Sequence, residues 1–262
     1  MIKKLPWLLL IGVTTFLCWY FLFVAKLQLG GDIVEYYGIT ESLKNHQSLE
    51  LTSEDQEKLE QVLYPAYFSD PGYYIEGRNS NRYPVHFFFY SILATPIRLL
   101  IEITQLQPIA ALWIVNVLAF VALNMLVWKW YVKEPSERIL LLLLALFSPL
   151  MSFFIWPGPD ILFISLLTIG SFAFVHKDYK KAALFAALAS WHSQPIIIIT
   201  GVFLLYYMLT AQYTKKKLKI NLPAVGAAFA IGLLALIPYG YNYLAFGVLT
   251  PWSILADGWT TL

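Results

Sequence analysis

Continuous apolar runs recur along this chain from Leu5 to Gly247. About 20 helical residues cross the hydrocarbon core of a bilayer, and most of the runs approach that length. Only 13% of the 262 residues are charged, against about 25% in a soluble domain, so too few charges remain to solvate a soluble surface. We therefore predict an all-α polytopic membrane protein. A soluble enzyme, a disordered tail and a nucleic-acid-binding protein are excluded, and a β-barrel is excluded because the runs do not alternate.

Seven runs are predicted to be transmembrane helices of a single membrane domain that covers residues 1–262. They are residues 5–25, 108–128, 139–156, 161–175, 182–191, 195–209 and 222–246. Tyr and Trp gather at the ends of the runs, as residues that anchor helices at the membrane interface do. The first run is too long for a signal peptide and no small-residue cleavage site follows it, so we expect it to remain in the protein as a helix.

The distribution of Lys and Arg predicts how the helices are oriented. Twelve of the 18 basic residues lie in four short segments between the runs, namely residues 3–4, 129–138, 177–181 and 215–219. Cytoplasmic loops carry an excess of Lys and Arg, so these segments and the N-terminus are predicted to be cytoplasmic. Residues 26–107 then form one large external loop. Residues 248–262 form an external tail, at which the chain is either truncated or ends as a naturally short module.

The external loop is predicted to hold amphipathic juxtamembrane helices. Apolar residues at helical spacing predict a helix over Ile33–Leu43, whose apolar face is expected to lie on the membrane surface. The pattern from Ser53 to Gln56 resembles a capping box and predicts a second helix over Glu54–Leu63. The Asp70-Pro71-Gly72 sequence indicates a turn.

Two further segments depart from the regular pattern of spans. Residues 85–103 are apolar enough to cross, but a crossing there would invert every later loop, and Arg98 with Glu102 one turn later favours an interfacial helix. The run over residues 182–191 has ten residues, which is about 15 Å of helix and half a bilayer. It ends at the break Trp191-His192-Ser193-Gln194-Pro195. Non-helical polar backbone at membrane depth is tolerated only beside protein or a water-filled cavity, so we expect a cavity near His192 that opens to the outside.

Several short motifs, taken in order, resemble the GT-C superfamily of membrane glycosyltransferases over nearly the whole chain. The branch that the chain resembles most includes the protein O-mannosyltransferases and the aminoarabinose transferases of lipid A. The matching segments are GGDIVEYYGITESLKN, RYPVHFFFYSILATPIRLL, FSPLMSFFIWPGPDILFISLL, AALFAALASWHSQPIIII and NYLAFGVLTP. The resemblance implies an enzyme that transfers a sugar from a polyprenyl-phosphate donor to a protein, lipid or polysaccharide acceptor on the outer face of the membrane.

The resemblance also implies roles for residues of this chain. The family carries its catalytic acid in the loop after the first span, so Asp32, with Glu35, is the expected base for an inverting attack on the anomeric carbon. The donor phosphate needs cationic or hydrogen-bonding partners, for which the candidates are Arg78, Arg82 and His192. Asp160 is expected to act as a second acid at the substrate site, and Gln194 is a further candidate for substrate binding. Some relatives use a divalent cation such as Mg²⁺ or Mn²⁺, and the carboxylates of Asp32, Glu35 and Asp160 are suitable oxygen ligands.

Each candidate also has a plainer interpretation. Asp32 together with Glu35 can cap the helix that follows, and Asp160 can cap the fourth span. The two loop arginines can be solvated charges, and His192 can hydrogen-bond to a helix end. Two other functions stay open as well: a non-catalytic subunit or truncated relic of such an enzyme, and a flippase for lipid-linked sugars, because broken helices also mark transporter sites.

Overall fold

The computed structural model describes residues 4–26, 32–55, 57, 59, 74–78, 81–214, 217–218 and 221–250, and most of these are helical. The long helices are α1 (Leu5–Trp19), continued by the π-helical turn η2 (Tyr20–Val24), α2 (Ile33–His46), α4 (Phe89–Thr104), α5 (Ala110–Trp130), α6 (Pro135–Leu146), α8 (Asp160–Val175), α9 (Tyr179–Ala189), α10 (Ile197–Gln212) and α11 (Leu222–Phe246). Three shorter helices are η5 (Pro149–Met151), α7 (Ser152–Ile155) and η6 (Gln194–Ile196). Antiparallel hairpins join β1 (Tyr74–Glu76) to β2 (Arg82–Pro84) and β3 (Tyr213–Thr214) to β4 (Lys217–Leu218).

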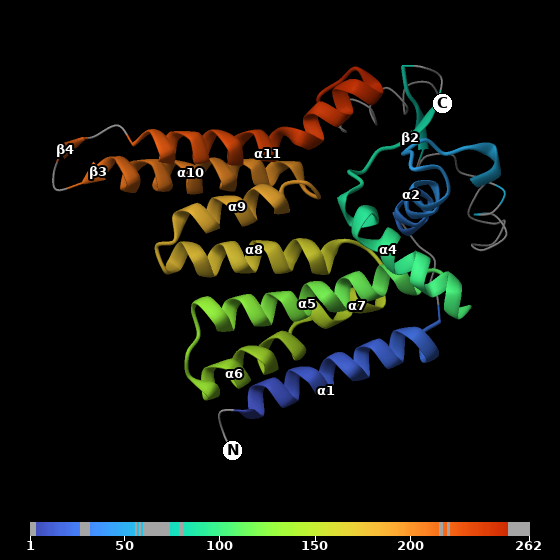
Figure 1. Ribbon diagram of the computed structural model, residues 1–262, viewed down its shortest axis with the longest axis horizontal. Coiled ribbons are helices and arrows are strands. Elements are labelled where there is room, and N and C mark those ends of the chain that lie inside the picture. Colours follow the sequence, from blue (N-terminus) through green and yellow to red (C-terminus); the bar gives the residue numbers. More distant parts are fainter. Residues whose placement is uncertain are drawn as a thin grey trace.

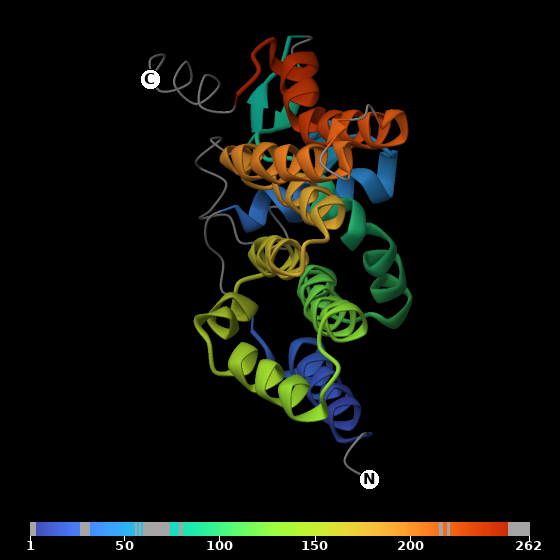
Figure 2. The same ribbon diagram turned by 90° about the vertical axis from the view of Figure 1, so that its left-hand side faces the viewer.

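Most of the long helices lie side by side in one bundle, whereas α2 and α4 lie at its end (Figure 1). Helix α5 packs against α1, α6 and α8, and the stack continues from α8 through α9 and α10 to α11. Figure 2 shows the same succession from the blue α1 to the red α11. Alanines on α9 are fully buried between its neighbours, namely Ala182, Ala183, Ala186, Ala187 and Ala189. Such small side chains let helix backbones approach closely inside a membrane.

Four helical segments within the described residues are long and apolar enough to cross a membrane: α1 with η2, α5, η6 with α10, and α11. The pair formed by α6 and the η5–α7 segment passes the same test together, with a bend of 54° between its halves. Helices α8 and α9, with 16 and 11 residues, are shorter. The prediction of a mostly helical chain is therefore confirmed, with four to five helices long and apolar enough to span a membrane. The seven predicted runs lie in helical segments, and the run over residues 139–156 is broken between α6 and α7.

The basic segments lie at the end of the bundle opposite to α2 and α4. In Figure 1 the connections from α5 to α6 and from α8 to α9, together with the β3–β4 hairpin, lie at the left-hand end. Helices α2 and α4 and strand β2 lie at the right-hand end. The described helices of the predicted external loop, α2 and α4, are thus gathered at one end of the bundle (Figure 1).

Helix α2 is confirmed where the sequence predicts it, but its surroundings correct the prediction. Every residue from Ile33 to Ser42 is buried, so α2 lies inside protein and does not rest an apolar face on the membrane surface. Helix α4 packs against it. Arg98 of α4 is 7% exposed and forms an ion pair with Glu41 of α2, while Glu102 pairs with Lys44 at 3.0 Å. Arg98 is therefore a buried residue that ties α4 to α2 rather than a wetted one.

The predicted capping box is displaced by one residue. The backbone N–H of Asp55 donates to the hydroxyl oxygen of Thr52, and the backbone N–H of Thr52 donates to the Asp55 carboxylate, both at 3.2 Å. Thr52 therefore takes the place predicted for Ser53. Three predicted features lie outside the described residues: most of the helix over Glu54–Leu63, the turn at residues 70–72 and the tail from residue 251.

Candidate functional site: an acid–imidazole cluster

Six polar side chains from distant parts of the chain meet at the end of the bundle that carries α2 and α4. We call them the acid–imidazole cluster: Asp32, Glu35, Tyr36, His86, Asp160 and His192. The first three come from the start of α2, and His86 comes from the segment between β2 and α4. Asp160 begins α8, and His192 lies in the break between α9 and η6. The cluster is therefore assembled from the predicted external loop and from two helix ends at the same end of the bundle, the start of α8 and the connection after α9.

His86 is the centre of one half of the cluster. Its Nδ1 lies 2.6 Å from Glu35 Oε2, and its backbone N–H donates to Glu35 Oε1 at 2.7 Å. Its Nε2 lies 3.6 Å from Asp32 Oδ2. The Glu35 side chain is 1% exposed, whereas the Asp32 side chain is 45% exposed. Glu35 is thus fully occupied in holding His86, and Asp32 is the acid of the pair that is open to an incoming molecule.

The two acids change the protonation of His86. Burial by itself lowers the pKa of this imidazole, but the hydrogen bond and charge of Glu35, together with the charge of Asp32, outweigh it and raise the pKa to about 9. A histidine normally titrates near pH 6.5. His86 is therefore a cation at neutral pH.

His192 is the centre of the second half. Its Nδ1 lies 3.5 Å from the Tyr36 hydroxyl, and its Nε2 lies 4.0 Å from Asp160 Oδ1. Burial lowers the pKa of His192, assisted by the positive charge of His86 and opposed by Asp160 and Asp32. Burial also raises the pKa of Tyr36 well above its usual value, so its hydroxyl remains a donor. When Tyr36 donates to Nδ1, a neutral His192 carries its proton on Nε2.

Tyr36 connects the two halves. Its hydroxyl contacts His192, and its ring centroid lies 5.8 Å from that of His86. The ring is 1% exposed and packs edge-to-face on Tyr90 of α4 at 5.5 Å. This buried tyrosine fixes the distance between an imidazolium and a neutral imidazole.

The plainer interpretations of the two aspartates are only partly met. Asp32 occupies the position that caps α2, but its side chain makes no capping hydrogen bond. Glu35 does not complete a capping box, because both of its oxygens bind His86. Asp160 is the first residue of α8 rather than its cap, which is Pro159. Both aspartate side chains are therefore directed to the cluster instead of to their own helices.

The remaining candidates lie apart from the contacts of the cluster. The guanidinium of Arg78 lies over the ring of Tyr243 at 5.0 Å and against Gly247, at the end of α11. Arg82 is an exposed residue of β2, opposite Glu76. The backbone oxygen of Gln194 accepts a hydrogen bond from Tyr239 at 3.3 Å. The structure thus brings Asp32, Glu35, Asp160 and His192 together, whereas Arg78 contacts the end of α11, Arg82 pairs with β1 and Gln194 contacts Tyr239.

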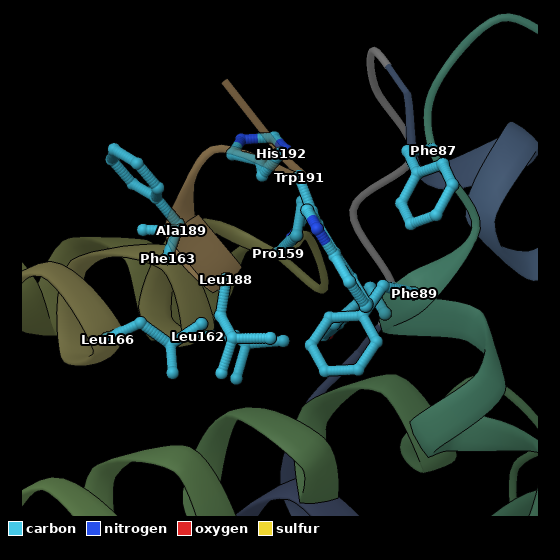
Figure 3. Close-up of a pocket in the computed structure, with 11 residues that line it drawn as sticks. Phe87, Phe89, Pro159, Leu162, Phe163, Leu166, Leu188, Ala189, Trp191 and His192 are labelled. Atoms are coloured by element: carbon cyan, nitrogen blue, oxygen red, sulfur yellow. The ribbon is translucent and has the colours of Figure 1, made fainter. Parts of the chain in front are cut away.

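A small aromatic cavity adjoins the cluster at His192 (Figure 3). Its volume is about 20 Å³, enough for about one water molecule. His192 and Trp191 lie at its upper side in Figure 3, with Leu162 and Leu166 below them. The indole N–H of Trp191 donates to the Leu234 oxygen at 2.7 Å, which fixes the ring. A cavity is therefore present near His192, as predicted, but it is small and its wall is mostly apolar.

The described residues contain no group of three or more His, Cys, Asp or Glu that is arranged to hold a metal ion. The carboxylates suggested as ligands for Mg²⁺ or Mn²⁺ contact different histidines: Glu35 binds His86, whereas Asp160 faces His192. The chemistry derived below therefore uses side chains alone.

Two residues of the cluster, Tyr36 and His86, are absent from the sequence-based candidates. Tyr36 reads as one of several apolar residues at helical spacing in the Ile33–Leu43 pattern. His86 directly precedes the aromatic run Phe87-Phe88-Phe89-Tyr90 and lies in the same predicted loop as the two acids. A histidine between a polar stretch and an apolar helix is the one feature of the sequence that indicates His86 as a site residue.

Comparisons with known proteins identify no relatives. No protein-family model matches the chain, and no curated protein or solved structure matches it significantly. The function is therefore argued from the cluster and from its place in the membrane bundle.

Proposed function

We propose that this protein is a membrane glycosyltransferase that uses the acid–imidazole cluster to transfer a sugar from a polyprenyl-phosphate donor. One observation carries the proposal: an exposed carboxylate, an imidazolium and a neutral imidazole meet at one end of a bundle that contains helices long and apolar enough to span a membrane. A base and a hydrogen-bond donor for a departing phosphate are the groups that such a transfer requires. The resemblance of the sequence motifs to the GT-C superfamily supports the same reaction.

The proposed topology has seven spans, with α8 and α9 counted among them, and the N-terminus in the cytoplasm. The gathering of the basic segments at the end opposite to α2 and α4 supports this orientation (Figure 1), because cytoplasmic loops are rich in Lys and Arg. The cluster then faces the outside of a cell membrane, level with the ends of the helices. A lipid-linked donor in the outer leaflet can present its phosphate at that level while its tail remains in the bilayer.

Asp32 is the proposed base. In the transfer, an acceptor hydroxyl oxygen attacks the anomeric carbon of the sugar and gives its proton to the Asp32 carboxylate. The new carbon–oxygen bond forms as the bond from the anomeric carbon to the phosphate oxygen breaks, and the phosphate leaves with that electron pair. His86 is a positioning residue: held by the buried Glu35, it places its Nε2 3.6 Å from Asp32 Oδ2 and so orients that carboxylate.

His192 is the proposed partner of the leaving phosphate. Its Nε2 lies 4.0 Å from Asp160, beyond hydrogen-bond range, so its N–H is able to donate to a phosphate oxygen. Tyr36 holds the ring in the required orientation. Sugar acceptors in the form of a protein, a lipid or a polysaccharide all offer the hydroxyl that this scheme needs.

The test is sugar transfer in proteoliposomes that contain the purified protein. Polyprenyl-phosphate mannose, glucose and aminoarabinose are supplied with a radioactive sugar, and transfer to membrane acceptors or release of free sugar is measured. Asp32→Asn is expected to lower the rate at least ~100-fold, the usual contribution of a general base. Glu137→Gln, an exposed acid at the other end of the bundle, is the matched control and is expected to leave the rate unchanged.

Other outcomes assign the protein to another class. A wild-type rate in Asp32→Asn removes Asp32 as base and overturns the proposed mechanism. Movement of the labelled donor between leaflets without any glycosyl product identifies a flippase. Activity that requires a copurifying glycosyltransferase and is insensitive to Asp32→Asn identifies a non-catalytic subunit.

A further inference from the structure

Helix α11 contains a buried proline, Pro238, well inside its length. Proline has no backbone N–H, so the carbonyl four residues earlier, that of Leu234, receives no hydrogen bond from it within the helix. A proline at such a position bends a helix, and in Figure 1 the last turns of α11 are bent away from the rest of the helix. The proline therefore leaves one backbone acceptor of α11 open to a partner from another element.

Trp191 supplies that partner. Its indole N–H donates to the Leu234 oxygen at 2.7 Å, and Trp191 directly precedes His192 of the acid–imidazole cluster. In membrane bundles a carbonyl freed by proline is satisfied by a neighbouring element in this way. Just past the proline, the Tyr239 hydroxyl donates to the Gln194 oxygen at 3.3 Å. Helix α11 thus holds the connection that carries His192 on both sides of that histidine.

The next turn of α11 holds the segment that carries His86. The Tyr241 hydroxyl donates to the Pro84 oxygen at 2.8 Å, two residues before His86. The Tyr241 ring also packs edge-to-face on Phe88, with the ring centroids 5.2 Å apart, and on Phe87 at 6.0 Å. One residue of α11 therefore contacts the chain directly before and directly after His86.

Both histidines are thus held by a short part of α11, although α11 contributes no side chain to the acid–imidazole cluster. Leu234 and Tyr241 lie seven residues apart, which is about 10 Å along the helix, and Pro238 lies between them. The two segments that they hold also touch each other, because the rings of Phe87 and Trp191 pack edge-to-face with centroids 5.2 Å apart. A change in the bend at Pro238 therefore moves one segment relative to the other.

We propose that the bend of α11 at Pro238 sets the separation of His86 and His192. Pro238 and Tyr241 are then positioning residues, which act on the two histidines through the chain that carries them. A site keeps its geometry when a second layer of contacts fixes the groups that act. The effect on sugar transfer rests on the proposed function, whereas the placement of the two histidines does not.

The first test is Pro238→Ala in the full chain. Alanine restores the backbone N–H, which competes with Trp191 for the Leu234 oxygen and straightens the helix. Because alanine is the better helix former, we expect the thermal stability in detergent to stay at or above that of the wild type. The connection after α9 is expected to loosen. The pKa of His192, which burial and the charge of His86 lower, is then expected to rise toward the usual 6.5.

NMR titration of ¹³C-labelled histidines measures this pKa, and a His192→Gln spectrum assigns the signal. Pro223→Ala is the matched control, because Pro223 lies in the first turn of α11, where the N–H groups have no partner within the helix. It is expected to leave the pKa of His192 unchanged.

Tyr241→Phe tests the other histidine. The variant removes only the hydroxyl that holds Pro84. The chain that presents His86 to Glu35 is then released, so the pKa of His86 is expected to fall from about 9. Tyr243→Phe, on an exposed tyrosine of the same helix end, is the matched control and is expected to leave that pKa unchanged.

Sugar transfer in proteoliposomes separates this inference from the proposed function. Pro238→Ala is expected to slow transfer ~10- to 100-fold, the cost of misplacing a catalytic group by about 1 Å. A raised pKa of His192 with unchanged transfer supports the placement of the histidines and contradicts the role proposed for His192. An unchanged His192 pKa in Pro238→Ala, or an unchanged His86 pKa in Tyr241→Phe, overturns the inference. So does an equal rise of the His192 pKa in Pro223→Ala.

Discussion

Replacing Glu35 by Gln tests the electrostatic design of the acid–imidazole cluster most directly. The variant keeps the shape of the side chain and removes the charge that holds His86. In the variant, burial still lowers the pKa of His86, and only the charge of Asp32 still raises it. The pKa of His86 is therefore expected to fall from about 9 toward the usual 6.5. Selective ¹³C labelling of histidine measures this pKa by NMR titration in detergent, and a His86→Gln spectrum assigns the signal.

The loss of stability expected in Glu35→Gln follows from the shift in the pKa of His86. A rise from 6.5 to about 9 corresponds to about 3 kcal/mol of preference for the charged form. The His86 side chain is 36% exposed, and screening by solvent reduces that value. We expect a loss of about 2 kcal/mol of unfolding free energy in Glu35→Gln at low pH, within the range for a hydrogen bond between charged groups.

The sign of the pH dependence follows from the direction of the same shift. Folding raises the pKa of His86, so the protonated His86 stabilises the folded state. This contribution to the free energy of unfolding is fully present below pH 6.5 and is lost as the pH rises through about 9. The difference in thermal stability between wild type and Glu35→Gln is therefore expected to be largest near pH 6 and to shrink toward pH 9.5. Glu134→Gln, an exposed acid at the far end, serves as control. A difference that grows with pH, or a His86 pKa that stays near 9 in the variant, refutes the reasoning.

Three further predictions concern stability and orientation. Arg98→Met removes one of the two ion-pair partners of the buried Glu41 carboxylate, which keeps Lys44 at 3.1 Å, and is expected to cost about 2 kcal/mol in thermal unfolding, the effect of a lost hydrogen bond between charged groups; no destabilisation would contradict that role. Gly247→Ala places a side chain at a φ of +83° and is expected to cost about 1 kcal/mol, whereas Gly226→Ala, in open space on α11, is expected to stabilise by a similar amount. A single cysteine at Ser193 is expected to react with an impermeant reagent from the outside only, and labelling from the cytoplasm alone reverses the topology.

The sequence predicted the helices well because hydrophobicity is a local property. Each of the seven predicted runs is largely helical, although the run over residues 139–156 is broken between α6 and the η5–α7 segment, and α2 begins at Ile33 as its apolar spacing indicates. The capping position was wrong by one residue, because Thr52 and Ser53 are equally suitable caps and only the position of Asp55 decides between them. The polar connection after α9 was likewise predictable, because Pro195 cannot continue a helix that precedes it.

The composition of the acid–imidazole cluster, by contrast, was decided by tertiary structure. The sequence singled out Asp32, Glu35, Asp160 and His192, because they lie in motifs that resemble those of the GT-C superfamily and in connections predicted to be external. It gave no reason to join His86 to Glu35, which are 51 residues apart, or to separate Arg78 from the acids. Pairing between distant residues depends on how helices pack, and packing is determined by side chains that touch only after folding.

The same distinction explains the burial of α2. The alternation of polar and apolar residues along α2 indicates an amphipathic helix, and a sequence contains no information on whether the polar face meets water or protein. In the folded chain Arg98 of α4 neutralises Glu41, and His86 neutralises Glu35, so α2 is buried with its charges paired. Hydrophobic runs long enough to span a bilayer specified a membrane protein from the sequence alone, because that requirement is met segment by segment. Which acids are exposed and which are neutralised was specified only by the tertiary structure, because a charge is paired by its neighbours in space.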